Sequence, residues 1–263
     1  MNYKTGNISL HVEDQGRGEP TLLFLHYWGG TSRTWGRVIS NLRDQFRCVA
    51  YDQRGWGKSD KPSQGYALSD LAKDALTLIE ALGLRSYVLV GHSMGGKIAQ
   101  LLASQRPDRL VGLVLVAPAP PTPVYFSEEA REIQIHAYDN RETALQSVGF
   151  LTARPPAPEL VEQIVEDSLS GSKEAKLAWP TASILEDISS SVALINVPTL
   201  ILAGEHDRVD SVDQHRKEVL SRIRNAKLEI VTGSGHLSPI DEPQQLAAAI
   251  KRFATGLDAA PDQ

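Results

Sequence analysis

Cysteine is almost absent from this chain, since Cys48 is the only one among 263 residues. A disulfide within the chain is therefore excluded, and the apolar surroundings of Cys48 in FRCVAYD favour a small buried side chain over a reactive thiol. Long apolar runs are also missing. No stretch reaches the roughly 18 residues of a membrane helix, and the N-terminus lacks the apolar core of a signal peptide. We therefore expect a cytoplasmic protein with no membrane partner.

Excess positive charge is missing as well. Lysine and arginine number 27 against 32 aspartates and glutamates, which gives a formal net charge of −5 and argues against nucleic acid as a partner. Apolar residues make up 41% and charged residues 22% of the chain, as in ordinary globular proteins. We expect one large domain, or one domain that carries an insertion, present as a monomer or a homodimer.

What the chain does contain is a regular succession of short apolar runs and amphipathic stretches. Strands are expected in ISLHV, TLLFLH, FRCVAY, YVLVG, LVGLVLVA, VPTLILAG and KLEIVT. Helices are expected in RTWGRVISNLRDQ and LSDLAKDALTLIEALGL, and at 93–105, 213–220 and 243–255. The apolar runs do not alternate with polar residues, which is typical of strands covered on both faces. The sequence thus predicts an α/β protein with a mostly parallel sheet flanked by helices.

This rhythm stops after Ala117. A proline-rich PAPPTP is followed by a long stretch with no convincing strand, in which helices are expected at 127–138, 142–150, 158–169 and 174–178. We expect residues 118–188 to form a helical cap (lid) inserted in a core domain of residues 1–117 and 189–263. The tail at 256–263, GLDAAPDQ, is expected to be disordered.

A single serine stands out at the end of one expected strand. YVLVG runs directly into HSMGG, which sets Ser93 between Gly91 and Gly95. A strand-to-helix turn of this kind strains the serine backbone and leaves no room for bulky neighbours two positions away. The N–H groups that open the following helix would stabilise an oxyanion. Ser93 is therefore a candidate nucleophile on a nucleophile elbow.

A serine nucleophile needs a base, and the base needs a partner that fixes its tautomer. His236 lies in the glycine-containing loop VTGSGHLSPIDEP after the last expected strand, where it could reach over the strand ends. Four carboxylates follow the penultimate strand in TLILAGEHDRVD: Glu205, Asp207, Asp210 and Asp213. Along the chain the serine comes first, the acid second and the histidine third. This is the order of α/β-hydrolases, and it differs from the order in both classes of serine protease.

These segments resemble the α/β-hydrolase fold family from residue 8 to about residue 255. The chain is most similar to the small cofactor-free esterases, lactonases and haloperoxidase-like enzymes with one helical cap. The resemblance rests on LFLHYWGG, YDQRGWGKSD, VLVGHSMGG, LILAGEHD and GSGHLSPIDEP, in that order. It implies an α/β-hydrolase core with no cofactor, and no metal-ligand spacing is found. The family pattern Gly-x-x-Asp falls on Gly204 and Asp207, which selects Asp207 and leaves Asp210 in reserve.

The resemblance also implies an oxyanion hole made by the backbone N–H groups of Met94 and Trp28. The family usually has His-Gly-x where this chain has His26, Tyr27 and Trp28, so Tyr27 replaces a glycine. The phenol of Tyr27 could hydrogen-bond a substrate, or it could simply pack against the loop. The other candidate substrate contacts are Met94, Tyr125, Phe126 and Trp179.

The residues together predict a serine hydrolase with a catalytic triad, acting on a small carboxylic ester or lactone through an acyl-enzyme intermediate. Two alternatives share the fold: a cofactor-free haloperoxidase or perhydrolase, and a hydrolase of carbon–carbon bonds. A haloalkane dehalogenase is disfavoured, because that resemblance requires a carboxylate where Ser93 stands. An alternative of another class is a ligand receptor with vestigial hydrolase activity, which would turn over slowly and only once.

Overall fold

The computed structural model describes residues 1–257 of the chain, so the part of the expected disordered tail at 258–263 lies outside the described residues. Gly256 and Leu257, also assigned to that tail, instead continue the last helix, α11 (Pro243–Leu257). Eight strands form one sheet in the order β1-β2-β4-β3-β5-β6-β7-β8. Their bounds are β1 (Asn2–Thr5), β2 (Ile8–Gln15), β3 (Thr21–Leu25), β4 (Cys48–Tyr51), β5 (Tyr87–His92), β6 (Leu110–Val116), β7 (Thr199–Gly204) and β8 (Ala226–Val231).

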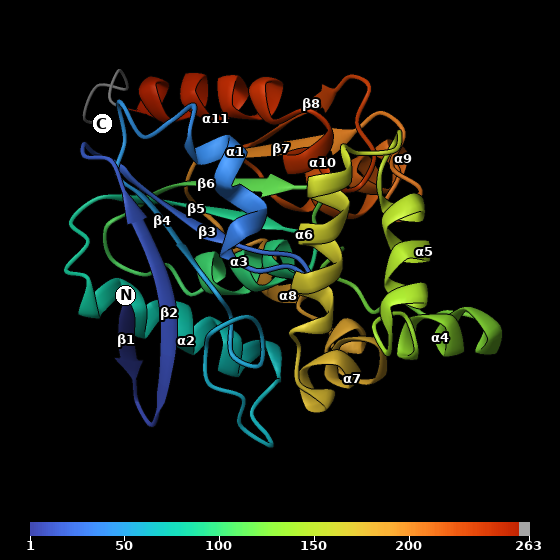
Figure 1. Cartoon of the computed structure of the whole chain (residues 1–263). Helices are drawn as coiled ribbons and strands as arrows, with labels where there is room; N and C mark the ends of the chain where they lie inside the picture. The colour runs from blue at the N-terminus through green and yellow to red at the C-terminus, as the bar shows by residue number, and fades with distance from the viewer. Residues whose placement is uncertain (258–263) are drawn as a thin grey trace.

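The sheet is mostly parallel, as the sequence predicted. From β4 to β8 all neighbouring strands pair in parallel, and only β1 and β2 run antiparallel to their neighbours. Helices cover both faces: α2 (Leu68–Ala81) and α3 (Met94–Ser104) on one, α1 (Gly36–Ile39) and α11 on the other (Figure 1). Leu23 and Leu25 pack on the α2–α3 side, while Leu22 and Phe24 pack on the α1–α11 side. Because both faces are covered, the central strands are apolar throughout.

Three local features differ from the sequence predictions: one strand was missed and two expected helices were wrong. The strand β1 has a polar sequence, NYKT, without the apolar pattern that would have revealed it, and it pairs with β2 across a turn at Gly6. The helix expected in RTWGRVISNLRDQ is reduced to a 3₁₀ turn (Ser32–Trp35) and α1. There the Ser40 and Asn41 side chains both donate to the carbonyl oxygen of Arg37 and so compete with helical hydrogen bonds.

The third concerns the segment after β7. Instead of one helix at 213–220, the chain forms α9 (Val212–Gln214), a wider π turn (His215–Val219) and a 3₁₀ turn (Leu220–Arg222). Periodicity in sequence does not separate these forms, because each is too short to show its own repeat.

The segment between β6 and β7 is helical, without a strand among its described residues. It holds α4 (Glu128–Ile135), α5 (Arg141–Leu151), α6 (Pro158–Leu169), α7 (Lys173–Thr181), a 3₁₀ turn (Ser183–Leu185) and α8 (Ser189–Val192). Figure 1 shows α4–α7 gathered on one side, beyond the ends of the central strands. We propose the division into a core and a cap at 118–188, which is supported by this grouping.

The two ends of the 118–188 segment are joined to each other. The N–H of Ile188 donates to the carbonyl oxygen of Pro121 at 2.9 Å. The ammonium of Lys97, which is fully buried on α3, donates to the carbonyl oxygens of Thr122 and Ile184 at 3.3 and 3.0 Å. The two ends of the segment therefore lie side by side next to α3, where the segment joins the rest of the molecule.

Nowhere in residues 1–257 does a helix combine the length and the apolar character that crossing a membrane would require.

Candidate active site

Ser93 occupies the strained turn that its flanking glycines predicted. It lies between β5 and α3 with φ 52° and ψ −114°, a backbone conformation that residues with a side chain rarely adopt. A Cβ at Gly91 would overlap the carbonyl oxygen of Gly95, and a Cβ at Gly95 would come within 2.5 Å of the carbonyl oxygen of Leu25. Both glycines are therefore required by close backbone contacts around Ser93.

Asp207 and His236 are brought together from two loops. The Nδ1 atom of His236 lies 2.9 Å from Oδ2 of Asp207, and both side chains are almost completely buried. The second carboxylate oxygen of Asp207 accepts the backbone N–H groups of Val209 and Asp210 at 2.8 and 3.1 Å. These donors fix the carboxylate with one oxygen turned to the histidine.

Of the four carboxylates considered, Asp207 is the one that hydrogen-bonds His236. Glu205 accepts the backbone N–H of Gly233, and Asp213 forms an exposed ion pair with Arg216 at 2.9 Å. Asp210, the reserve candidate, is buried and accepts a 3.0 Å hydrogen bond from the side chain of Gln214. Its burial raises the pKa of the Asp210 carboxyl to about 7, with a further contribution from the nearby charge of Asp207.

Opposite pKa shifts mark the Asp207–His236 pair. Burial alone would raise the pKa of Asp207, but attraction to His236 and the hydrogen bonds it accepts hold that pKa below its usual value. Burial alone would lower the pKa of His236, but the charge and hydrogen bond of Asp207 raise it above the ordinary value. The pair thus stabilises a protonated imidazole, as a general base requires.

The loop that holds His236 also contacts the turn that holds Ser93. His92, the residue before Ser93, donates from Nε2 to the carbonyl oxygen of His236 at 2.8 Å, and the two imidazole rings lie 5.3 Å apart between centroids. Burial and, to a smaller extent, the nearby His236 lower the pKa of His92 to about 3, so His92 remains a neutral donor. His92 therefore ties the His236 loop to the turn that holds Ser93.

The loops of Asp207 and His236 meet at Gly204, which leads to the first testable prediction. A Cβ at Gly204 would overlap the carbonyl oxygen of Gly235, next to His236. We expect Gly204→Ala to lower the free energy of unfolding by about 1–3 kcal/mol, because one of the two backbones must move. Gly36→Ala is the control, since a Cβ there meets nothing within 4 Å. Urea unfolding curves measure both, and equal stabilities of the two variants would contradict the prediction.

The peptide between Tyr27 and Trp28 has a fixed orientation. The backbone N–H of Gln53 donates to Nε2 of His26 at 3.0 Å, so the imidazole carries its proton on Nδ1. That Nδ1 donates to the carbonyl oxygen of Tyr27 at 2.7 Å, and the N–H of Gly30 donates to the same oxygen. Since the C=O and N–H of a trans peptide point in opposite directions, these bonds set the direction of the Trp28 N–H.

Residues of the 118–188 segment hold Trp28 from the other side. The hydroxyl of Tyr138 donates to the carbonyl oxygen of Trp28, and the indole N–H of Trp28 donates to the carbonyl oxygen of Lys176, both at 3.1 Å. The hydroxyl of Ser168 donates to the carbonyl oxygen of Gly29 at 3.0 Å. The loop that carries the expected oxyanion donor is therefore supported by that segment as well as by the sheet.

The candidate substrate contacts fall into three environments. Met94 and Trp179 are buried in the apolar cluster on the α2–α3 side, and Phe126 packs against it. Tyr27 is buried in another cluster and lies 5.2 Å from the ring of His92 between centroids, which favours the packing interpretation of its phenol. Tyr125 is 81% exposed. The structure thus gathers Met94, Phe126 and Trp179 in one cluster and leaves Tyr125 on the surface.

Three residues around the site were not singled out from the sequence: Tyr138, Arg208 and Asp241. Asp241 accepts the backbone N–H of Gly235, beside His236, at 2.8 Å. It belongs to the motif GSGHLSPIDEP that carried the family resemblance, which was the available signal. Tyr138 and Arg208 act through contacts between distant segments, which leave no local pattern.

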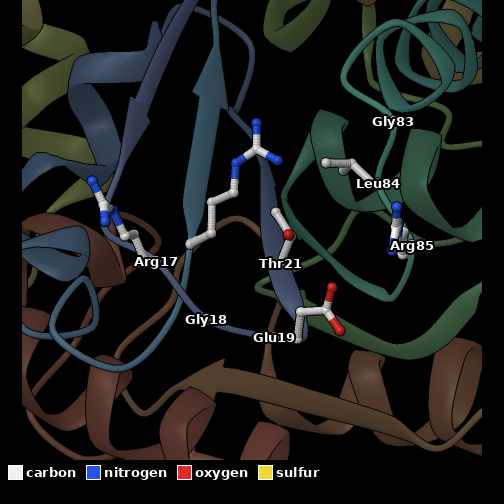
Figure 2. Close-up of a pocket in the computed structure, with 8 residues that line it drawn as sticks. Arg17, Gly18, Glu19, Thr21, Gly83, Leu84 and Arg85 are labelled. Carbon is white, nitrogen blue, oxygen red and sulfur yellow. The ribbon is translucent and has the colours of Figure 1, made fainter.

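A surface pocket of about 330 Å³ lies elsewhere, and it contains none of these residues. Figure 2 shows Arg17, Glu19, Thr21 and Arg85 around it. Thr21 is the first residue of β3, whereas Trp28 and Ser93 follow the carboxyl ends of β3 and β5. The pocket is therefore at the opposite end of the strands from the candidate active site.

Residues 1–257 include no group of three or more His, Cys, Asp or Glu side chains placed to hold a metal ion.

The chain belongs to the alpha/beta hydrolase family, whose sequence profile matches residues 22–249. A bifunctional esterase/perhydrolase of Acinetobacter calcoaceticus is 28% identical to it, over 96% of this chain and 99% of that protein. A 3-oxoadipate enol-lactonase of Acinetobacter baylyi is 27% identical, over 94% of this chain and 95% of that protein. The solved structure of a bromoperoxidase from Bacillus anthracis superimposes with a TM-score of 0.86 and 25% identity, covering 94% of this chain and 96% of that chain.

Proposed function

We propose that this protein is a serine hydrolase that cleaves a small carboxylic ester or lactone through an acyl-enzyme intermediate, with Ser93, Asp207 and His236 as the catalytic triad. The observation that carries the proposal is the buried 2.9 Å hydrogen bond between Asp207 and His236. The loop of His236 also contacts His92, the residue before Ser93. The enol-lactonase and the esterase/perhydrolase among its relatives support the substrate class.

In the proposed reaction, the Ser93 oxygen attacks the carbonyl carbon while His236 accepts the hydroxyl proton on Nε2. Asp207 holds the imidazole through Nδ1 and stabilises its positive charge. The N–H groups of Met94 and Trp28 bind the oxyanion. His236 then protonates the leaving alkoxide, which yields the alcohol and the acyl-enzyme. Water deprotonated by His236 attacks the acyl-enzyme and releases the acid and free Ser93.

A second candidate function shares the first half of this reaction. If hydrogen peroxide replaces water in the attack on the acyl-enzyme, the product is a peracid and Ser93 is regenerated in the same way. Two similar proteins, named an esterase/perhydrolase and a bromoperoxidase, support this second candidate function. The ratio of peracid to acid formed from one ester in the presence of peroxide decides between the two.

The proposal is tested by hydrolysis of p-nitrophenyl esters from acetate to decanoate, and of unsubstituted lactones. We expect steady turnover and stoichiometric labelling of Ser93 by a fluorophosphonate, located by mass spectrometry. The chain-length optimum would measure the acyl pocket. Absence of turnover with every ester and lactone would contradict the proposal and direct attention to diketone cleavage. One slow turnover without a steady rate would favour the receptor alternative.

A further inference from the structure

Helix α5, in the 118–188 segment, ends against the loops that carry Asp207 and His236. We define the α5 end as residues Gly149–Ala153, the last turn of the helix and the two residues after it. Figure 1 shows α5 running toward α10 (Ser238–Asp241), which follows the His236 loop. The last carbonyl groups of a helix have no partner within the helix, so they must be satisfied from outside.

Arg208 supplies two of these hydrogen bonds. It follows Asp207 directly, and its Nη2 atom donates to the carbonyl oxygens of Gly149 and Thr152, both at 2.9 Å. The guanidinium carbon also lies 5.4 Å from the centre of the Phe150 ring. A cation at the negative end of a helix dipole is favourable, and one planar group reaches two carbonyls at once. The Asp207 loop is thereby joined to the α5 end.

The His236 loop is joined to the same five residues. The backbone N–H of Leu237, next to His236, donates to the carbonyl oxygen of Leu151 at 3.0 Å. On the other side of His236, one carboxylate oxygen of Asp241 accepts the N–H groups of Gly235 at 2.8 Å and Ala153 at 3.0 Å. The backbones are in direct contact, because a Cβ at Gly235 would lie 2.7 Å from the Ala153 nitrogen.

We propose that Arg208 is a positioning residue that fastens the Asp207 loop to the α5 end, which also binds the His236 loop, so that the 118–188 segment helps to hold the acid and the base in register. This inference rests on the proposed function for its kinetic consequence. Without the guanidinium, the carbonyls of Gly149 and Thr152 lose their donor. The α5 end is then held less firmly against the Asp207 loop, and its contacts with Leu237 and Asp241 hold the His236 loop less firmly in turn. Arg208 itself contacts no reacting atom in this scheme.

The kinetic test compares the wild type with Arg208→Ala and Arg208→Lys. We expect kcat for a good p-nitrophenyl ester to fall about 10- to 100-fold in Arg208→Ala, because small displacements of catalytic groups have effects of this size. KM should stay within about twofold, since no substrate contact is removed. Arg208→Lys should be intermediate, because it keeps the charge but loses the guanidinium whose Nη2 atom reaches both carbonyls. Millimolar methylguanidinium should partly restore kcat in Arg208→Ala only.

The control is Arg252→Ala, which removes another exposed arginine, paired with Glu229 at 2.9 Å on the surface. It should match the wild type. An unchanged kcat in Arg208→Ala, or a loss confined to KM, would overturn the proposal.

Hydrogen–deuterium exchange separates this inference from the proposed function. In Arg208→Ala the amides of Ala153, Gly235 and Leu237 should exchange faster than in the wild type, while those of the central strands should not change. This readout needs no substrate, so it holds even if the wild type hydrolyses no ester. Wild-type exchange at all three amides, or faster exchange throughout the chain, would refute the specific contact.

Discussion

Ser93→Ala is expected to lower kcat for ester hydrolysis by about 10³- to 10⁶-fold, as removal of a triad nucleophile does in serine hydrolases. The elbow places this hydroxyl at the start of α3, and His92 ties the same turn to the His236 loop. Alanine keeps the turn but leaves no atom to form the acyl-enzyme. Residual hydrolysis would then come from the oxyanion donors and from binding alone.

The matched control for Ser93→Ala is Ser104→Ala, at the other end of the same helix. Ser104 is also buried, and its hydroxyl donates to the carbonyl oxygen of Leu101 at 2.7 Å. It should retain wild-type kcat. Initial rates with p-nitrophenyl butyrate and fluorophosphonate labelling measure both variants. If Ser93→Ala kept more than a tenth of the wild-type rate, the nucleophile assigned here would be wrong.

Asp207→Asn is expected to lower kcat by about 10²- to 10⁴-fold. The N–H groups of Val209 and Asp210 bind one oxygen of Asp207, so an asparagine there would place its oxygen on them and turn its NH₂ toward Nδ1 of His236. That arrangement requires a bare Nδ1 and puts the imidazole proton on Nε2, which then cannot accept the Ser93 proton.

Asp207→Asn also moves the pH profile. The pKa of His236 is raised because Asp207 overcomes the effect of burial. A general base works when it is deprotonated, so the rising limb of kcat/KM should lie above the pH expected for an ordinary histidine. Removing the Asp207 charge leaves burial opposed only by the smaller effect of Asp210, which lowers the pKa of His236 and shifts the limb to lower pH.

The exposed Asp213, paired with Arg216, provides the control for this prediction. Asp213→Asn should keep the wild-type rate and profile. The measurement is kcat and kcat/KM from pH 5 to 9 for the wild type, Asp207→Asn, Asp210→Asn and Asp213→Asn. If Asp210→Asn lost more activity than Asp207→Asn, Asp210 would be the working acid.

The parts of the fold that could be predicted from the sequence are those set by local patterns. The helix at 158–169 was predicted with its observed bounds, because Pro158 starts it and apolar residues repeat along it at helical spacing. The elbow was predicted because Gly91 and Gly95 flank Ser93 within one short motif, although the contact that requires Gly95 is with the carbonyl oxygen of Leu25, which is distant in sequence. The apolar character of the buried runs predicted that the strands would pair mostly in parallel, but not which strands would be neighbours.

The remaining features depend on segments distant in sequence. The support of Trp28 comes from Tyr138 and Lys176, more than 100 residues away. Arg208 reaches Gly149 across 59 residues. Such pairs leave no periodicity, and an arginine or tyrosine in a loop has many possible partners. Packing of the 118–188 segment against the sheet decides which partner such a side chain contacts.

The α5 end limits which pieces of this chain could be exchanged with those of a relative. Substrate range in such proteins could be altered by grafting a foreign helical insertion in place of residues 118–188. A graft that ended cleanly at those boundaries would discard the carbonyl acceptors of Arg208 and the Ala153 amide that Asp241 binds. A workable chimera would have to carry the Gly149–Ala153 turn, or its equivalent, together with the loops it contacts. The unit of recombination is therefore larger than the inserted helices themselves.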